Sequence, residues 1–198
     1  MTFSILPKGA IHHAYIMAFS TIDDLSEVDG GRDICAQNGE VMDIVEQSQA
    51  WAKKLQSRCG QPVGNSGELA AFCAFARSYP TNFLVHIDTY DALQSGLSNF
   101  LAVSLALHAA GYAPVGIALD SGDLAYQSKE ARRVFRKVAD TFEIPSFRDL
   151  RAYLHPAIPP VPSHCNFLMH HVSYLVGMRA EAQVVQRTNC RNCWLKWD

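Results

Sequence analysis

The chain has 198 residues, of which 48% are hydrophobic and 18% are charged, and its formal net charge is -2. This composition is typical of a soluble globular protein, and the length fits one sizeable domain or two small ones. The charge balance provides no basic field for nucleic acid and no polybasic patch for a membrane surface, and the longest apolar run, near 99–110, is too short to cross a bilayer, so neither partner is expected.

The first eighty residues contain one undecided segment, one loop and two helices. The undecided segment is apolar, and its periodicity does not distinguish a strand from the start of a buried helix. The loop is acidic and contains two adjacent glycines. Gly60 ends the first predicted helix, whereas Ser66 caps the second and Pro80 ends it. In chain order, these segments are residues 11–19, 23–38, 40–59 and 67–79.

The middle of the chain alternates short apolar runs with helical patterns, which predicts a βαβα unit with parallel strands and a right-handed crossover. The strands are expected at 83–87 and 113–119, and the helices at 98–110 and 124–142. Each strand is followed by acidic residues. Ligand-binding groups gather at the carboxyl ends of parallel strands, so we expect Asp88, Asp91, Asp120 and Asp123 to share one rim.

The character of the sequence changes at about residue 151, which predicts a partial catalytic α/β unit over 1–150 and an irregular tail over 151–198. Four prolines between 156 and 162 exclude a regular helix there. The tail also contains a CxxC pair, together with further histidines and a cysteine. A single CxxC is weak support for zinc, and chance composition is the favoured interpretation. The residues are His164, Cys165, His170, His171, Cys190 and Cys193.

Four motifs, in this order, carry a resemblance to a known family. They are PKGAIHHAY at 7–15, GELAAF at 67–72, DTYD at 88–91 and LDSGDL at 119–124. The last two together are the most specific. The chain resembles nicotinate phosphoribosyltransferase over roughly residues 5–150. The resemblance implies an incomplete (β/α) barrel of the nicotinate/quinolinate phosphoribosyltransferase type.

The resemblance also implies a reaction in NAD biosynthesis. Nicotinate and phosphoribosyl pyrophosphate would give nicotinate mononucleotide, with coupled ATP hydrolysis through a phosphohistidine and with Mg²⁺ at the diphosphate. The substrates are small molecules, and the implied assembly is a homodimer. The six cysteines are spread without a dense framework, and residues 1–8 show no signal-peptide pattern, so a reducing cytoplasm is expected.

Residue roles follow from the resemblance. His13 takes the place of the phosphorylated histidine, and a neutral imidazole nitrogen is a suitable phosphate acceptor. Asp88 and Asp120 are the other expected catalytic residues, because carboxylates stabilise the positive charge that develops on the ribose. Asp88 is also the expected metal ligand. Substrate binding is expected from Thr89, Tyr90, Ser121, Gly122 and Asp123.

A structural interpretation competes with each of these roles. Aspartates commonly cap helices and form turns, and paired histidines such as His12 and His13 are often hydrogen-bonded structural residues. The chain also departs from the family pattern: Ala118 stands where arginine is usual, and no glycine-rich phosphate segment follows residue 142. An alanine cannot pair with an anionic substrate. The alternative hypothesis is therefore a catalytically inactive, truncated homologue that acts only as an interaction partner.

Overall fold

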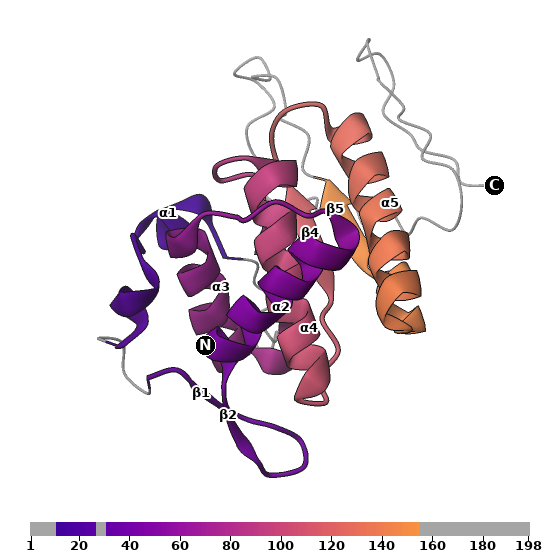
Figure 1. Ribbon diagram of the computed structural model, residues 1–198. Coiled ribbons are helices and arrows are strands. Elements are labelled where there is room, and N and C mark those ends of the chain that lie inside the picture. The colour runs from indigo at the N-terminus through magenta and orange to yellow at the C-terminus, as the bar shows by residue number, and fades with distance from the viewer. Residues whose placement is uncertain (1–10, 27–30, 155–198) are drawn as a thin grey trace, which may run out of the picture.

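The computed structural model describes residues 11–26 and 31–154, which form a mixed α/β structure (Figure 1). The helices are α1 (His13–Met17), α2 (Ile44–Cys59), α3 (Ser66–Ser78), α4 (Leu97–Ala109) and α5 (Leu124–Phe142). The strands are β1 (Asp33–Cys35), β2 (Val41–Asp43), β3 (Leu84–His86), β4 (Gly116–Leu119) and β5 (Arg151–Leu154). Short helical turns complete the described chain: η1 (Ile22–Ser26), η2 (Pro80–Asn82), η3 (Ala92–Gly96) and η4 (Pro145–Asp149).

The main sheet is parallel, with the strand order β3-β4-β5. The expected parallel pairing of β3 with β4 is confirmed, and His86 lies opposite Ala118. Strand β5 was not predicted; it pairs with β4 and carries the sheet through Leu154, past the change of character expected at 151. The remaining tail, with its candidate zinc ligands, lies outside the described residues.

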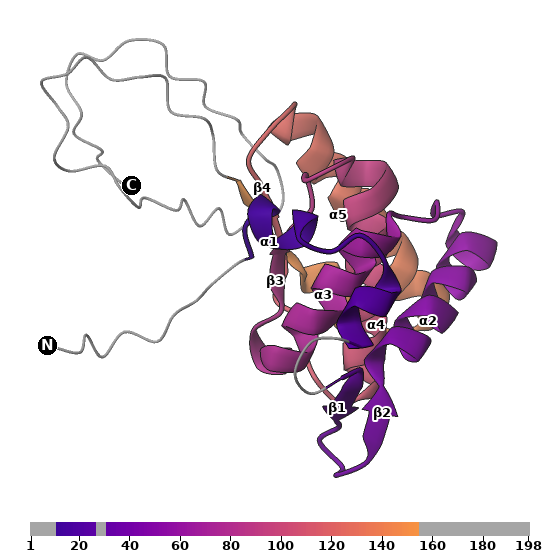
Figure 2. The same cartoon turned by 90° about the vertical axis from the view of Figure 1, so that its left-hand side faces the viewer.

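The two faces of the main sheet differ because successive side chains of a strand point in opposite directions. One face presents Val85, Ile87, Ile117 and Leu119, all completely buried. Figure 2 shows the strands on one side of a layer of helices, with α1 beside β3 and β4. The other face carries His86 and Ala118 in the same row. The apolar face of the sheet therefore packs against the core, and the opposite face, which carries His86, is available for a functional site.

An aromatic column ties this apolar face to two helices. Phe83, just before β3, stacks on Phe100 of α4 with ring centroids 5.6 Å apart. Phe100 in turn contacts Phe135 of α5 at 6.0 Å. All three side chains are completely buried. Burial of an aromatic side chain contributes about 1.5–3 kcal/mol, so this column is a large part of what fixes the strands against the helices.

The predicted helices are found, with corrected starts. Helix α2 begins at Ile44 rather than at residue 40, because the Asp43 side chain accepts hydrogen bonds from the N–H groups of Val45 and Glu46 and caps the helix there. Helix α3 is capped by Asn65, which accepts from the N–H of Glu68, and not by Ser66 as predicted. Gly60 ends α2 in the left-handed conformation, as expected.

The predicted loop at 23–38 is partly wrong. Its described residues contain the 3-10 turn η1 and strand β1, which pairs antiparallel with β2. Residues 41–43, expected in the helix, form this second strand. Three-residue strands carry too little periodicity to be recognised in a sequence. The hairpin lies at the bottom of Figure 1, away from the main sheet.

Helices α4 and α5 follow the predictions closely. Residues 97–107 of α4 are all buried, which agrees with its apolar character on every side. Helix α5 spans the predicted 124–142 and buries Ala131, Val134, Phe135 and Val138 along one stripe. Among the described helices, none combines the length and the apolarity needed to cross a membrane.

Candidate functional site

Strands β3 and β4 end side by side, and the residues after them form a hydrogen-bonded cluster. Asp88 Oδ2 accepts from the backbone N–H groups of Asp120 and Ser121 and from the Ser121 hydroxyl, all at 2.8 Å. The two acidic loops are therefore joined through a single carboxylate oxygen. The expectation that Asp88 and Asp120 share one rim is confirmed.

The Asp88 carboxylate is set up to stay ionised. Its side chain is only 3% exposed, and this burial raises the pKa. The hydrogen bonds from Asp120 and Ser121 outweigh that effect, and the net pKa of Asp88 lies below its ordinary value. The second oxygen, Oδ1, is buried and accepts no hydrogen bond within the described part of the chain, and the same holds for Asp120 Oδ1. Two carboxylate oxygens thus remain for a ligand.

His13 lies beside this pair. It is the first residue of α1, and its Nδ1 lies 2.9 Å from the Thr89 hydroxyl. Its Nε2 lies 3.7 Å from Asp120 Oδ2. The preceding segment is anchored by a parallel bridge between Ile11 and Val85 of β3, which brings the start of α1 to the ends of the strands. Residues 11–19, for which the sequence did not decide between strand and helix, therefore contain one bridge residue, Ile11, followed by the short helix α1.

His86 completes the cluster and was not predicted from the sequence. Its Nδ1 lies 3.4 Å from Asp120 Oδ2 and 4.0 Å from Asp88 Oδ1, and its side chain is only 6% exposed. The His13 ring is tilted against it with centroids 5.3 Å apart, and His12 stacks on it at 6.0 Å. The sequence feature that could have identified His86 is its position two residues before Asp88, since residues i and i+2 of a strand share a face.

The other predicted residues are divided between two arrangements. Thr89 and Ser121 belong to the cluster through the contacts given above. Asp91 and Asp123 instead cap helices: Asp91 accepts from the N–H groups of Leu93 and Gln94, and Asp123 accepts from that of Tyr126. These two follow the structural interpretation. Tyr90 is exposed, at 48%, and Gly122 takes a positive φ of 79° in the turn before α5.

A buried polar network supports the loop after β3 from behind. Glu68 of α3 is completely buried, and its Oε2 accepts from the Ser95 hydroxyl at 2.5 Å and from the Asn99 amide at 3.0 Å. Ser95 also accepts from the N–H of Asn65, the α3 cap. Burial raises the pKa of Glu68 more than these two hydrogen bonds lower it. The network fixes the π-helical turn η3, which connects the loop to α4.

Glycine is required in this turn. A Cβ on Gly96 would lie 1.9 Å from the carbonyl oxygen of Ile87, one residue before Asp88. The backbone of η3 therefore packs directly against the end of β3, and only glycine permits the approach. Backbone and side-chain contacts from four sequence regions, at 11–13, 65–68, 86–99 and 118–121, together hold the cluster in place.

Comparison with known proteins identifies the relationship. No family model matches the chain. Nicotinate phosphoribosyltransferase of Dictyostelium discoideum is 41% identical over 145 residues, covering 73% of this chain and 23% of that protein. Nicotinate phosphoribosyltransferase 2 of Arabidopsis thaliana is 40% identical over 151 residues, covering 73% and 26%. The chain is homologous to part of nicotinate phosphoribosyltransferase.

The structural comparison agrees with the sequence comparison. The crystal structure of human nicotinic acid phosphoribosyltransferase matches with a TM-score of 0.67 at 37% identity, over 74% of this chain and 29% of that one. The chain spans about a quarter of the length of the curated relatives it matches. The predicted resemblance to nicotinate phosphoribosyltransferase is therefore confirmed, and the resemblance covers one portion of that enzyme.

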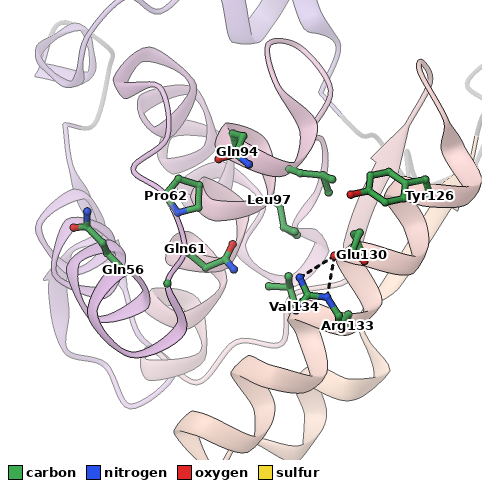
Figure 3. A pocket seen from close by; sticks show the side chains of 11 residues that line it. Gln56, Gln61, Pro62, Gln94, Leu97, Tyr126, Glu130, Arg133 and Val134 are labelled. Atoms are coloured by element: carbon green, nitrogen blue, oxygen red, sulfur yellow. Dashed lines mark hydrogen bonds and ion pairs between the residues drawn. The ribbon is translucent and has the colours of Figure 1, made fainter.

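A cavity of about 500 Å³ lies between α2, η3, α4 and α5, apart from the cluster. Figure 3 shows Gln61, Gln94 and Tyr126 around it, with Arg133 paired to Glu130 on its α5 side. None of the cluster residues His13, Asp88 and Asp120 lines this cavity.

The cluster fits a hard divalent cation through its carboxylates. Magnesium prefers oxygen ligands, usually one or two carboxylates together with substrate phosphates. Asp88 Oδ1 and Asp120 Oδ1 are buried oxygens that accept no hydrogen bond from the described residues. An ionised Asp88, favoured by its lowered pKa, supplies the required negative charge.

Proposed function

We propose that the protein acts in nicotinate phosphoribosyl transfer and that the cluster at the ends of β3 and β4 is the phosphoribosyl side of its active site. The observation that carries this proposal is the joining of Asp88 to the Asp120–Ser121 backbone, with His13 against Asp120. The reaction would form nicotinate mononucleotide from nicotinate and phosphoribosyl pyrophosphate, a step of NAD biosynthesis.

Asp88 and Asp120 have complementary roles in the proposal. Loss of pyrophosphate from the ribose leaves positive charge on the anomeric carbon and its ring oxygen. Preorganised carboxylates stabilise such charge strongly in a site from which water is excluded. Asp120 is half-exposed and able to reach a ribose hydroxyl, whereas Asp88 is locked in place by its hydrogen bonds. Ser121, Gly122 and Asp123 line the turn that would approach the sugar.

His13 has the geometry of a phosphoryl acceptor. The Thr89 hydroxyl occupies the region around Nδ1, which leaves Nε2 directed toward Asp120. The imidazole is 37% exposed, so a nucleotide phosphate can approach it. In the proposed coupling to ATP hydrolysis, His13 takes the terminal phosphoryl group at this nitrogen while ADP leaves, and later yields it to water as inorganic phosphate. Thr89 would fix the ring, while Tyr90 at the rim would contact the bound substrate.

The finer features of the proposal concern fold, metal and assembly. The parallel sheet β3-β4-β5 with helices on one face is consistent with part of a (β/α) barrel of the nicotinate/quinolinate phosphoribosyltransferase type. Mg²⁺, held by Asp88 and by the substrate's diphosphate, would neutralise the departing pyrophosphate. The proposal includes a homodimer and a cytoplasmic location.

The test is product formation by the purified protein. With nicotinate, phosphoribosyl pyrophosphate, ATP and Mg²⁺, we expect nicotinate mononucleotide by chromatography, and we expect Asp120→Asn and His13→Gln to lose most of it. Asp140→Asn, on the exposed side of α5, is the matched control and should keep the activity. Absence of product from the unaltered protein, together with co-purification of a separate active subunit, would support the inactive-partner hypothesis and overturn this one.

A further inference from the structure

The cluster contains two histidines, His13 and His86, whose nitrogen atoms are not the oxygen ligands that magnesium prefers. Among the described residues, His13, His86 and Asp88 form a group whose candidate ligand atoms lie within 4.8 Å of one another. Imidazole nitrogens suit zinc and other first-row transition metals, whereas magnesium prefers oxygen. We infer that this cluster is also a binding site for a divalent transition metal such as zinc or cobalt.

The distances approach those of a coordination sphere. Zinc bonds of about 2.0–2.2 Å in tetrahedral geometry separate neighbouring ligand atoms by about 3.3–3.6 Å. Here, His86 Nδ1 lies 4.0 Å from Asp88 Oδ1 and 3.4 Å from Asp120 Oδ2. His13 Nε2 lies 3.7 Å from the same Asp120 oxygen. The candidate ligand atoms of His13, His86 and Asp88 all lie within 4.8 Å of one another, so closing the sphere requires shifts of at most about 1.5 Å, and the partly exposed His13 ring has room to make them.

Burial and charge support the same conclusion. The Asp88 side chain is 3% exposed, and its Oδ1 accepts no hydrogen bond within the described ranges. A buried carboxylate oxygen without a hydrogen-bond donor is costly unless a ligand satisfies it. Two carboxylates with two neutral imidazoles give a net charge that balances a divalent cation.

The outer contacts are also those of a metal site. Metal-binding histidines usually have their other ring nitrogen fixed by a hydrogen bond, and the Thr89 hydroxyl lies 2.9 Å from His13 Nδ1. Asp88 is oriented through its second oxygen by three donors. Asp120 Oδ2 lies beside both histidines, at 3.7 Å from His13 Nε2 and 3.4 Å from His86 Nδ1, and adds negative charge next to the three ligands. If the proposed function also holds, a metal on His13 would block its phosphorylation.

The test is metal binding, measured without turnover, so its result does not depend on the proposed reaction. The full chain, stripped with a chelator, is titrated with Co²⁺ and the bound equivalents are counted by equilibrium dialysis and visible absorption. We expect His13→Gln, His86→Gln and Asp88→Asn each to lose one equivalent. His108→Gln, a histidine of α4 that packs on Phe147, is the matched control and should lose none.

The variants separate this site from the histidines and cysteines near the C-terminus. Binding there would be the same in every variant, so the difference from the unaltered chain isolates the cluster. His13→Gln changes a partly exposed side chain and should fold normally, which circular dichroism verifies. Equal numbers of bound Co²⁺ in the unaltered chain and in His13→Gln, both folded, would overturn the inference.

Discussion

The buried Glu68 supports the segment that forms the candidate site, and its contribution to stability can be tested by mutation. Its carboxylate is completely buried at the start of α3, and it accepts from Ser95 and Asn99 on the segment that follows β3. Replacing Glu68 by alanine would leave the buried Ser95 hydroxyl without its acceptor and would remove one of the two acceptors of the Asn99 amide, which also donates to the Asn65 carbonyl oxygen. Replacing it by glutamine keeps an acceptor in the same place and matches the neutral carboxyl group in size and charge.

The magnitude follows from the two hydrogen bonds. A buried donor that loses its hydrogen bond costs about 1–3 kcal/mol, so the two lost bonds of Glu68→Ala should lower the free energy of unfolding by about 2–6 kcal/mol. That is a large fraction of the stability of about 5–15 kcal/mol expected for a domain. Glu46→Ala, at an exposed position of α2, is the control and should cost at most about 1 kcal/mol.

The pH dependence distinguishes glutamate from glutamine. Burial raises the pKa of Glu68 above its ordinary value of 4.5, so the fold favours the neutral carboxyl group. The associated stability is fully present below pH 4.5 and is lost as pH rises through the folded-state pKa. Glu68→Gln has no such titration. Its stability relative to the unaltered protein should therefore increase with pH across this window and then level off.

Urea unfolding followed by circular dichroism at a series of pH values measures both effects. We expect a severe loss of stability for Glu68→Ala at every pH and a gain for Glu68→Gln that grows with pH. If Glu68→Ala costs less than about 1 kcal/mol, the buried network does not stabilise the fold as argued. If the Glu68→Gln difference is flat with pH, the raised pKa is wrong.

Three further predictions concern single residues. Gly96→Ala should destabilise the protein by about 1–3 kcal/mol in urea unfolding, because the new Cβ meets the Ile87 carbonyl oxygen. Asp123→Ala should cost about 1 kcal/mol through loss of the α5 cap, whereas Asp123→Asn should keep the stability. Burial raises the pKa of Cys73 to about 12, so iodoacetamide at pH 8 should modify the exposed Cys35 long before Cys73 in peptide mass spectrometry.

Each of these predictions has a contradicting result. Gly39→Ala is the control for Gly96, since its Cβ meets no atom within 4 Å and only its positive φ is strained. Equal costs for the two would contradict the close approach of η3 to β3. An Asp123→Asn variant as unstable as Asp123→Ala would contradict the cap. Early modification of Cys73 in the folded protein would contradict its burial.

The order of strands and helices in the middle of the chain could be predicted because its patterns are long and repeated. Helix α5 has a clear buried stripe, and the runs that became β3 and β4 are apolar and end in aspartate. Strand β5 could not be predicted in the same way. It has only four residues, it includes an exposed arginine at Arg151, and prolines follow soon after it. Strand β5 forms because it pairs with β4, a long-range contact that its own sequence does not indicate.

The candidate site was partly predictable for a similar reason. Asp88 and Asp120 follow their strands directly, so parallel pairing alone brings them together. Asp91 and Asp123 stand one turn later and cap helices, which the sequence left open. The Glu68 network depends on residues 27 and 31 positions away, a distance at which local patterns carry no information. His86 was detectable from its spacing to Asp88, but a lone histidine in an apolar run is a weak signal.

Binding of the phosphoribosyl group at the ends of β3 and β4 can be measured by calorimetric titration of the purified protein with phosphoribosyl pyrophosphate in the presence of Mg²⁺. We expect one site per chain and affinity reduced by at least about tenfold in Asp88→Asn and Asp120→Asn, a loss of about 1.4 kcal/mol or more, with Asp140→Asn unchanged. Absence of binding by the unaltered protein, or equal affinity in all four proteins, would contradict the claim that the ends of β3 and β4 hold the phosphoribosyl group.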